Sequence, residues 1–151
     1  MTTKGDPAPL TRLRTMPGWL IGQAGAYHHR LLAEGFAAVD ARGYHYRLLA
    51  ALTEHGPASQ AELARRTGID RSDVVAALNE LEPQSLIART PDPADRRRNV
   101  VTLTPEGAAR LAALGAVLTG IQDDLCAPLT FEEREELVRL LRLVVEREEK
   151  A

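Results

Sequence analysis

Residues 59–105 constrain the fold most tightly, because they encode two short helices, a sharp turn between them and then two short strands. Ser59 and Glu62 have the spacing of a capping box, in which each side chain accepts a hydrogen bond from a free backbone N–H at a helix start. Gly68 lies where the turn requires a positive φ, which glycine adopts without strain. Asp70 is a favoured N-cap for the second helix. This stretch therefore predicts a helix-turn-helix followed by a hairpin.

The second helix has one apolar and one polar face. The apolar residues recur at helical spacing and are expected to face inward; they are Val74, Ala77, Leu78 and Leu81. The opposite face carries Arg71, Ser72 and Asn79, which can face solvent or a partner. Any amphipathic helix pair shows such a pattern, so the helices alone do not define a function.

The hairpin adds a concentrated positive charge. Residues 87–90 and 99–103 are rich in strand formers, and the run 91–95 between them favours a turn. Three consecutive arginines follow at 96–98, and their planar guanidinium groups suit bidentate contacts to phosphates or bases. A solvated polar hairpin tip is the alternative interpretation, since most charge runs face solvent.

The order of helix, turn, helix and basic hairpin is that of the winged helix-turn-helix, whose second helix fits the DNA major groove while the hairpin reaches the adjacent minor groove. Arg71 and Ser72 are expected to reach base edges or phosphates. Asp95 is expected to pair with Arg97 and direct it into the minor groove. Strand alternation would turn the two neighbouring arginines the other way, onto phosphates. The candidate DNA-contacting residues are Ser59, Gln60, Arg71, Ser72, Asn79, Asp95, Arg96, Arg97 and Arg98.

Net charge does not by itself indicate a nucleic-acid partner. The formal charge of the chain is -2, and residues 59–98 contain seven arginines and seven acidic residues. Any basic surface must therefore be local. The rival interpretation is a dimerisation or protein-interaction module on a winged-helix scaffold that does not bind DNA. Such a module has little need for three exposed arginines on a hairpin, so these residues favour the DNA-binding interpretation.

The string over residues 89–107 resembles the wing of the MarR family, the multiple-antibiotic-resistance type of bacterial regulator, with its Asp-x-Arg pair and its Leu-Thr-x-x-Gly entry to the next helix. The resemblance implies a homodimer with two winged domains, usually a sequence-specific transcriptional repressor released by a small molecule. The wing aspartate and arginine of the family correspond to Asp95 and Arg97. Ser85 stands where a glycine is usual, which predicts an altered turn after the second helix.

Long apolar stripes at helical spacing flank the winged unit and exceed what it can cover. We therefore expect a single chain that is mainly α with a small β-wing (an α+β fold). Its expected parts are an N-terminal dimerisation helix over 10–40, a winged helix-turn-helix domain over 42–104 and C-terminal dimerisation helices over 105–150. A closed two-fold dimer would hold its recognition helices about one DNA turn (~34–36 Å) apart, which predicts a near-palindromic operator.

Aromatic and titratable side chains gather in the first third of the chain, which holds the single tryptophan, all three tyrosines and three of the four histidines. Together with an arginine they would suit a phenolic or aromatic carboxylate effector. The candidate ligand-binding residues are Arg14, Trp19, His28, Tyr44 and Tyr46. In the alternative interpretation, Trp19 and Tyr27 pack a dimer core, and His28, His29 and His45 lie on the surface.

Other classes of function lack their residues. No nucleophile–base pair and no His-x-x-x-His or Glu-x-x-His set occurs, so we expect neither an enzyme nor a metal or cofactor site. The single cysteine, Cys126, excludes an internal disulfide and is expected to be a small buried residue near a helix end. No run approaches the ~20 apolar residues of a membrane span. Residues 1–9 lack the apolar core of a signal peptide, so we expect a cytoplasmic protein.

Overall fold

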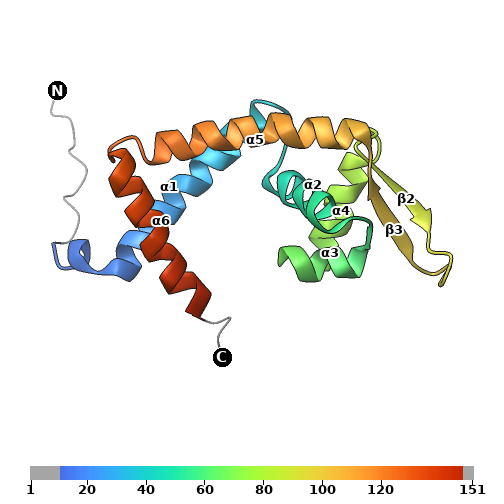
Figure 1. Cartoon of the computed structure of the whole chain (residues 1–151), viewed down its shortest axis with the longest axis horizontal. Coiled ribbons are helices and arrows are strands. Elements are labelled where there is room, and N and C mark those ends of the chain that lie inside the picture. Colours follow the sequence, from blue (N-terminus) through green and yellow to red (C-terminus); the bar gives the residue numbers. More distant parts are fainter. Residues whose placement is uncertain (1–10, 148–151) are drawn as a thin grey trace, which may run out of the picture.

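A computed structural model describes residues 11–147 and shows a chain of helices with a small antiparallel sheet (Figure 1). A 3₁₀ turn at Leu13–Thr15 is followed by α1 (Pro17–Ala37), α2 (Gly43–His55), the short strand β1 (Ala58–Ser59), α3 (Gln60–Thr67), α4 (Arg71–Leu81), β2 (Ile87–Pro91), β3 (Asn99–Leu103), α5 (Pro105–Leu125) and α6 (Phe131–Val145). This order confirms the predicted mainly α fold with a small β-wing.

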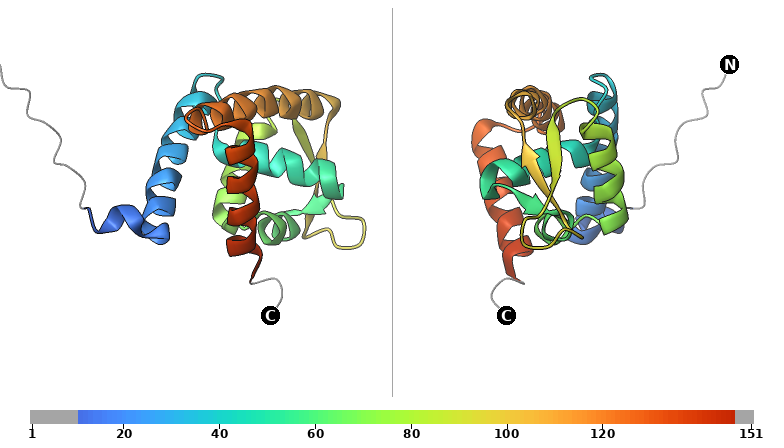
Figure 2. Two further views of the ribbon diagram at one scale, coloured as in Figure 1. Left: turned by 60° about the vertical axis from the view of Figure 1, so that its left-hand side comes forward. Right: turned by 90° about the vertical axis from the view of Figure 1, so that its right-hand side faces the viewer.

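Helix α5 connects the two halves of the molecule. It packs against α1 at one end and against α2 at the other, while α2, α3, α4 and the hairpin form the winged half (Figure 1). Helices α1 and α6 overlap in Figure 1 but are separate in Figure 2, and α6 has no buried residue. Helix α6 is therefore left exposed by the rest of the described chain, and α1 is covered mainly where it meets α5.

The helix-turn-helix forms largely as predicted. The hydroxyl of Ser59 accepts a hydrogen bond from the Glu62 amide and the Glu62 carboxylate accepts one from the Ser59 amide, both at 3.2 Å. Gly68 ends α3 with a φ of 69°. Asp70 occupies the N-cap position of α4, but its side chain makes no capping hydrogen bond. The four apolar residues predicted to face inward from α4 are all buried.

Strand β1 was not predicted. Its two residues pair with β3, Ala58 opposite Val101 and Ser59 opposite Val100, and give a three-stranded sheet in the order β1-β3-β2. A two-residue strand is too short to show the alternation of apolar and polar residues by which strands are recognised in a sequence. Pairing with β3 ties the start of α3 to the wing.

The turn after α4 keeps a left-handed residue although it lacks the expected glycine. Ser85 has a φ of 61°, its amide donates to the Glu82 carbonyl at 2.9 Å, and its carbonyl accepts the Thr104 hydroxyl at 2.6 Å. Ser85 is therefore a residue with a β-carbon in a conformation that favours glycine.

Ser85→Gly is expected to raise the free energy of unfolding by about 0.5 kcal/mol, because relief of the left-handed conformation outweighs the greater chain entropy of glycine when unfolded. Urea unfolding followed by circular dichroism measures this change. A variant less stable than the natural chain would show that Ser85 is not strained.

No helix among residues 11–147 combines the length and the apolar character needed to cross a membrane.

Candidate DNA interface and adjoining cavity

The first turn of α4 is open to solvent. Arg71 and Ser72 are both exposed there, as predicted for residues at the start of a recognition helix. Ser59 and Gln60 are half-buried at the start of α3, and the Ser59 hydroxyl is already used for capping. The side chains of Arg71 and Ser72 are therefore open to a partner, whereas the hydroxyl and the backbone amide of Ser59 are both hydrogen-bonded to Glu62.

Asn79, on a later turn of α4, has a partner from the wing. Its amide oxygen accepts a hydrogen bond from Arg89 of β2 at 2.8 Å, and the Arg89 Nε donates to Glu82 at 3.0 Å. The Arg89 hydrogen bond also holds the pKa of Glu82 below its usual value. Arg89 is only 18% exposed, and it fastens the wing to the C-terminal end of α4. Sequence reasoning missed this residue because a lone arginine in a strand gives no sign of its partner.

The wing tip is a pair of turns, and its arginines do not alternate as strand residues do. The Arg98 amide donates to the Asp95 carbonyl at 2.9 Å, and the Asp92 amide donates to the Arg98 carbonyl at 2.8 Å. The Asp95 carboxylate accepts the backbone amide of Arg97 at 3.0 Å and forms an ion pair with Arg98 at 3.8 Å. The expected side-chain pairing of Asp95 with Arg97 is therefore not formed, because the turn brings Arg98 back toward Asp95.

All three guanidinium groups of the tip remain exposed. Within residues 11–147, neither Arg96 nor Arg97 forms an ion pair. Two uncompensated cations thus project from a hairpin that Arg89 holds beside α4. This is the local positive charge that the neutral balance of the winged unit requires if the unit is to bind DNA.

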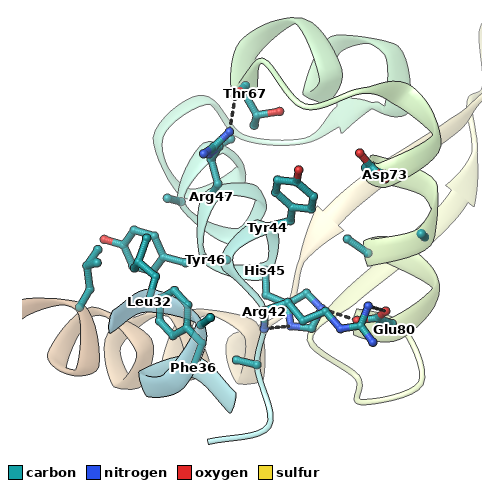
Figure 3. Close-up of a pocket in the computed structure, with 18 of the residues that line it drawn as sticks. Leu32, Phe36, Arg42, Tyr44, His45, Tyr46, Arg47, Thr67, Asp73 and Glu80 are labelled. Atoms are coloured by element: carbon teal, nitrogen blue, oxygen red, sulfur yellow. Dashed lines mark hydrogen bonds and ion pairs between the residues drawn. The ribbon is translucent and has the colours of Figure 1, made fainter. Parts of the chain in front are cut away.

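A cavity of about 1340 Å³ lies between α1, α2 and α4 (Figure 3). Three predicted ligand-binding residues line it, namely His28, Tyr44 and Tyr46. Tyr46 lies toward Leu32 and Phe36 of α1, while Tyr44 points into the space between α2 and α4 (Figure 3). The cavity therefore has an apolar side against α1 and a polar side against the recognition helix.

Arg14 and Trp19, the other two predicted ligand-binding residues, do not line this cavity. Arg14 lies in the 3₁₀ turn before α1, and Trp19 lies in the first turn of α1. Cations of the winged half line the cavity instead. Arg47, whose guanidinium lies 5.9 Å from the Tyr44 ring centre, donates to the Thr67 carbonyl at 3.2 Å.

The histidines agree only in part with the surface interpretation, because His45 is buried while His29 is exposed. His45 is buried, with 4% of its surface exposed, and its Nε2 lies 2.8 Å from a carboxylate oxygen of Glu80 in α4. His28 is half-buried and 3.1 Å from the Gln122 amide, while His29 is exposed. His45 shares the inward face of α2 with Leu48, Leu49 and Leu52, and this spacing was the available sign of its burial.

The open start of α4, the arginine-tipped wing and the flanking helices define a winged helix-turn-helix regulator that binds DNA. A model of the MarR family matches residues 40–98. The chain is 31% identical to the transcriptional repressor NicR of Pseudomonas putida over 134 residues. This match covers 89% of this chain and 85% of NicR. The chain belongs to the MarR family, as its wing indicated. It is a DNA-binding transcriptional regulator and not an enzyme.

Two solved structures place the fold among regulators with known binding partners. One is BpsR of Bordetella bronchiseptica, whose DNA binding is regulated by 6-hydroxynicotinic acid; it is 28% identical, with a TM-score of 0.73 over 86% of this chain and 93% of that one. The other is a mutant MarR from E. coli in complex with operator DNA. It is 25% identical, with a TM-score of 0.72 over 90% of this chain and 99% of that one.

Proposed function

We propose that this chain acts as a homodimeric repressor that binds a near-palindromic operator and is released from it by a small aromatic carboxylate or phenol. The observation that carries the DNA-binding part is the wing tip, where Arg96 and Arg97 are exposed and unpaired within the described residues. Arg71 and Ser72 would read the major groove, Arg97 would enter the minor groove, and the arginines beside it would contact phosphates.

Exposed apolar side chains on the flanking helices support the dimer. On α1, Leu20, Ile21 and Tyr27 are each more than 40% exposed. On α6 every leucine and valine is exposed, Val145 at 72%. A second copy that covered both helices would remove this surface from water. Such burial would stabilise the dimer by about 25 cal/mol for each Å² of apolar area. A closed pair would also present two α4 helices to successive turns of one DNA face.

The lining of the cavity supports the proposed binding of an aromatic effector. Its walls offer the aromatic faces of Phe36, Tyr44 and Tyr46 together with guanidinium groups, a combination that suits a planar aromatic anion. Because Asp73, Ala76, Ala77 and Glu80 of α4 form part of the lining, a bound molecule would touch the recognition helix directly.

Fluorescence anisotropy tests the regulatory function with labelled DNA from upstream of the gene for this chain. A scrambled duplex of equal length is the control, and two salt concentrations are compared. We expect tighter binding to the upstream DNA and a steep loss of affinity with salt, since phosphate contacts release counterions. Absence of binding to either duplex at low salt would favour an interaction module instead. Sedimentation of the free protein tests the dimer independently.

A further inference from the structure

We infer that the carboxylate of Glu80 occupies the anion-binding position of the cavity, between Arg42 and His45, so that an anionic effector and the recognition helix compete for the same two groups. The inference rests on the proposed effector and deepens it, because it identifies the subsite and the way in which occupation would reach α4.

The structure shows a carboxylate held at this position by two donors (Figure 3). One oxygen of Glu80 lies 2.8 Å from Nε2 of His45, and the other lies 3.2 Å from a guanidinium nitrogen of Arg42. The His45 side chain is only 5% exposed, so its donor has a fixed place in the fold.

The hydrogen-bond network assigns the ring proton of His45. Its Nδ1 accepts the backbone amide of Arg42, with a nitrogen–nitrogen distance of 3.4 Å. In a neutral imidazole the other nitrogen then carries the proton, so Nε2–H donates to the Glu80 carboxylate. The buried ring therefore presents a donor aimed at an anion, and it would do so equally for the carboxylate of a ligand.

Arg42 supplies the exchangeable part of the subsite. Its side chain is 76% exposed, against 34% for Glu80, and both residues line the cavity. An ion pair this open to water contributes little to stability, so displacement of one partner costs little. The other cation near the aromatic rings, Arg47, directs a donor to the Thr67 carbonyl, and no carboxylate within the described residues pairs with it.

Because of where the Arg42–Glu80 ion pair lies, its displacement by a ligand would affect the recognition helix. Arg42 is the N-cap of α2, directly after the turn that leaves α1, and Glu80 lies in the last turn of α4. The pair thus ties the recognition helix to the junction between the flanking helix and the winged unit. A ligand carboxylate that took the place of Glu80 would release this tie while the buried core of α4 remained packed.

Isothermal titration calorimetry with 6-hydroxynicotinate as the anionic probe and 6-hydroxynicotinamide as its neutral counterpart tests the competition. In Glu80→Gln the internal competitor has lost its charge, and we expect the acid to bind about tenfold more tightly while the amide changes by less than about twofold. In Arg42→Gln we expect the acid to bind about tenfold more weakly. Circular dichroism verifies that each variant is folded.

Glu54→Gln is the matched control, because Glu54 also lines the cavity but pairs with His55 and not with Arg42 or His45. It removes the same charge without removing the competitor, so the affinity for the acid should stay within about twofold of the natural value. An equal gain in affinity for the acid in Glu54→Gln would show that loss of any negative charge near the cavity is sufficient. That result would overturn the inference.

The remaining outcomes separate this inference from the proposed function. Binding of the acid to the natural protein without any gain in Glu80→Gln overturns the competition and leaves the effector proposal standing. Binding to Glu80→Gln alone supports the competition. Failure of the acid to bind to any variant overturns both the subsite and the aromatic carboxylate as effector, while operator binding is judged separately by anisotropy.

Discussion

Gly107→Ala is expected to lower the free energy of unfolding by about 3 kcal/mol. A β-carbon on Gly107 would lie 2.0 Å from the backbone carbonyl oxygen of Leu86 and 2.7 Å from a methyl group of Leu103. The leucine methyl can rotate away, but the carbonyl cannot, because it accepts the Thr104 amide at 3.2 Å. The first turn of α5 would therefore have to separate from the start of the hairpin.

Urea unfolding at a fixed protein concentration measures this loss, with Gly115→Ala as the control in the same helix. A β-carbon on Gly115 meets only a Tyr46 ring carbon at 3.9 Å, an ordinary contact. Alanine is a better helix former than glycine by about 1 kcal/mol, so this control should be as stable as the natural chain or slightly more so. Equal stability of both variants would show that α5 can shift at no cost.

Local patterns predicted the helix-turn-helix well because its interactions are short in sequence. The Ser59 capping box and the turn at Gly68 each depend on residues within a few positions of one another. The pattern Leu-Thr-x-x-Gly likewise singled out Gly107. The pattern did not give the reason for that glycine. The carbonyl that excludes a β-carbon belongs to Leu86, which precedes the hairpin in the sequence while Gly107 follows it.

The parts that the sequence did not predict depend on contacts between residues far apart in the sequence or on exact turn geometry. His45 and Glu80 are separated by 35 positions, and no periodicity links them. Asp95 pairs with Arg98 and not with the side chain of Arg97, because the tip folds as a turn and not as the alternating strand that the sequence predicts. In both cases the residue types were visible in the sequence, whereas their partners were set by the tertiary fold.

Arg97→Ala is expected to weaken operator binding by about 1–3 kcal/mol while leaving the fold intact. The side chain is exposed and forms no ion pair within the described residues, and the turn holds Arg97 through its backbone amide, which alanine retains. Loss of stability is therefore not expected to contribute. Anisotropy with the upstream duplex measures the change, and Arg139→Ala is the control: it also removes an exposed arginine, but from α6, where Arg139 pairs with Glu136.

The scrambled duplex then decides what Arg97 contacts. A guanidinium inserted in the minor groove responds to groove width and base composition, so its loss should reduce the preference for upstream over scrambled DNA. A phosphate contact would weaken both duplexes alike and make the salt dependence shallower by about one counterion. Unchanged affinity for both duplexes would remove Arg97 from the interface. Since Arg98 is already paired with Asp95, Arg96 would then be the remaining unpaired cation of the tip.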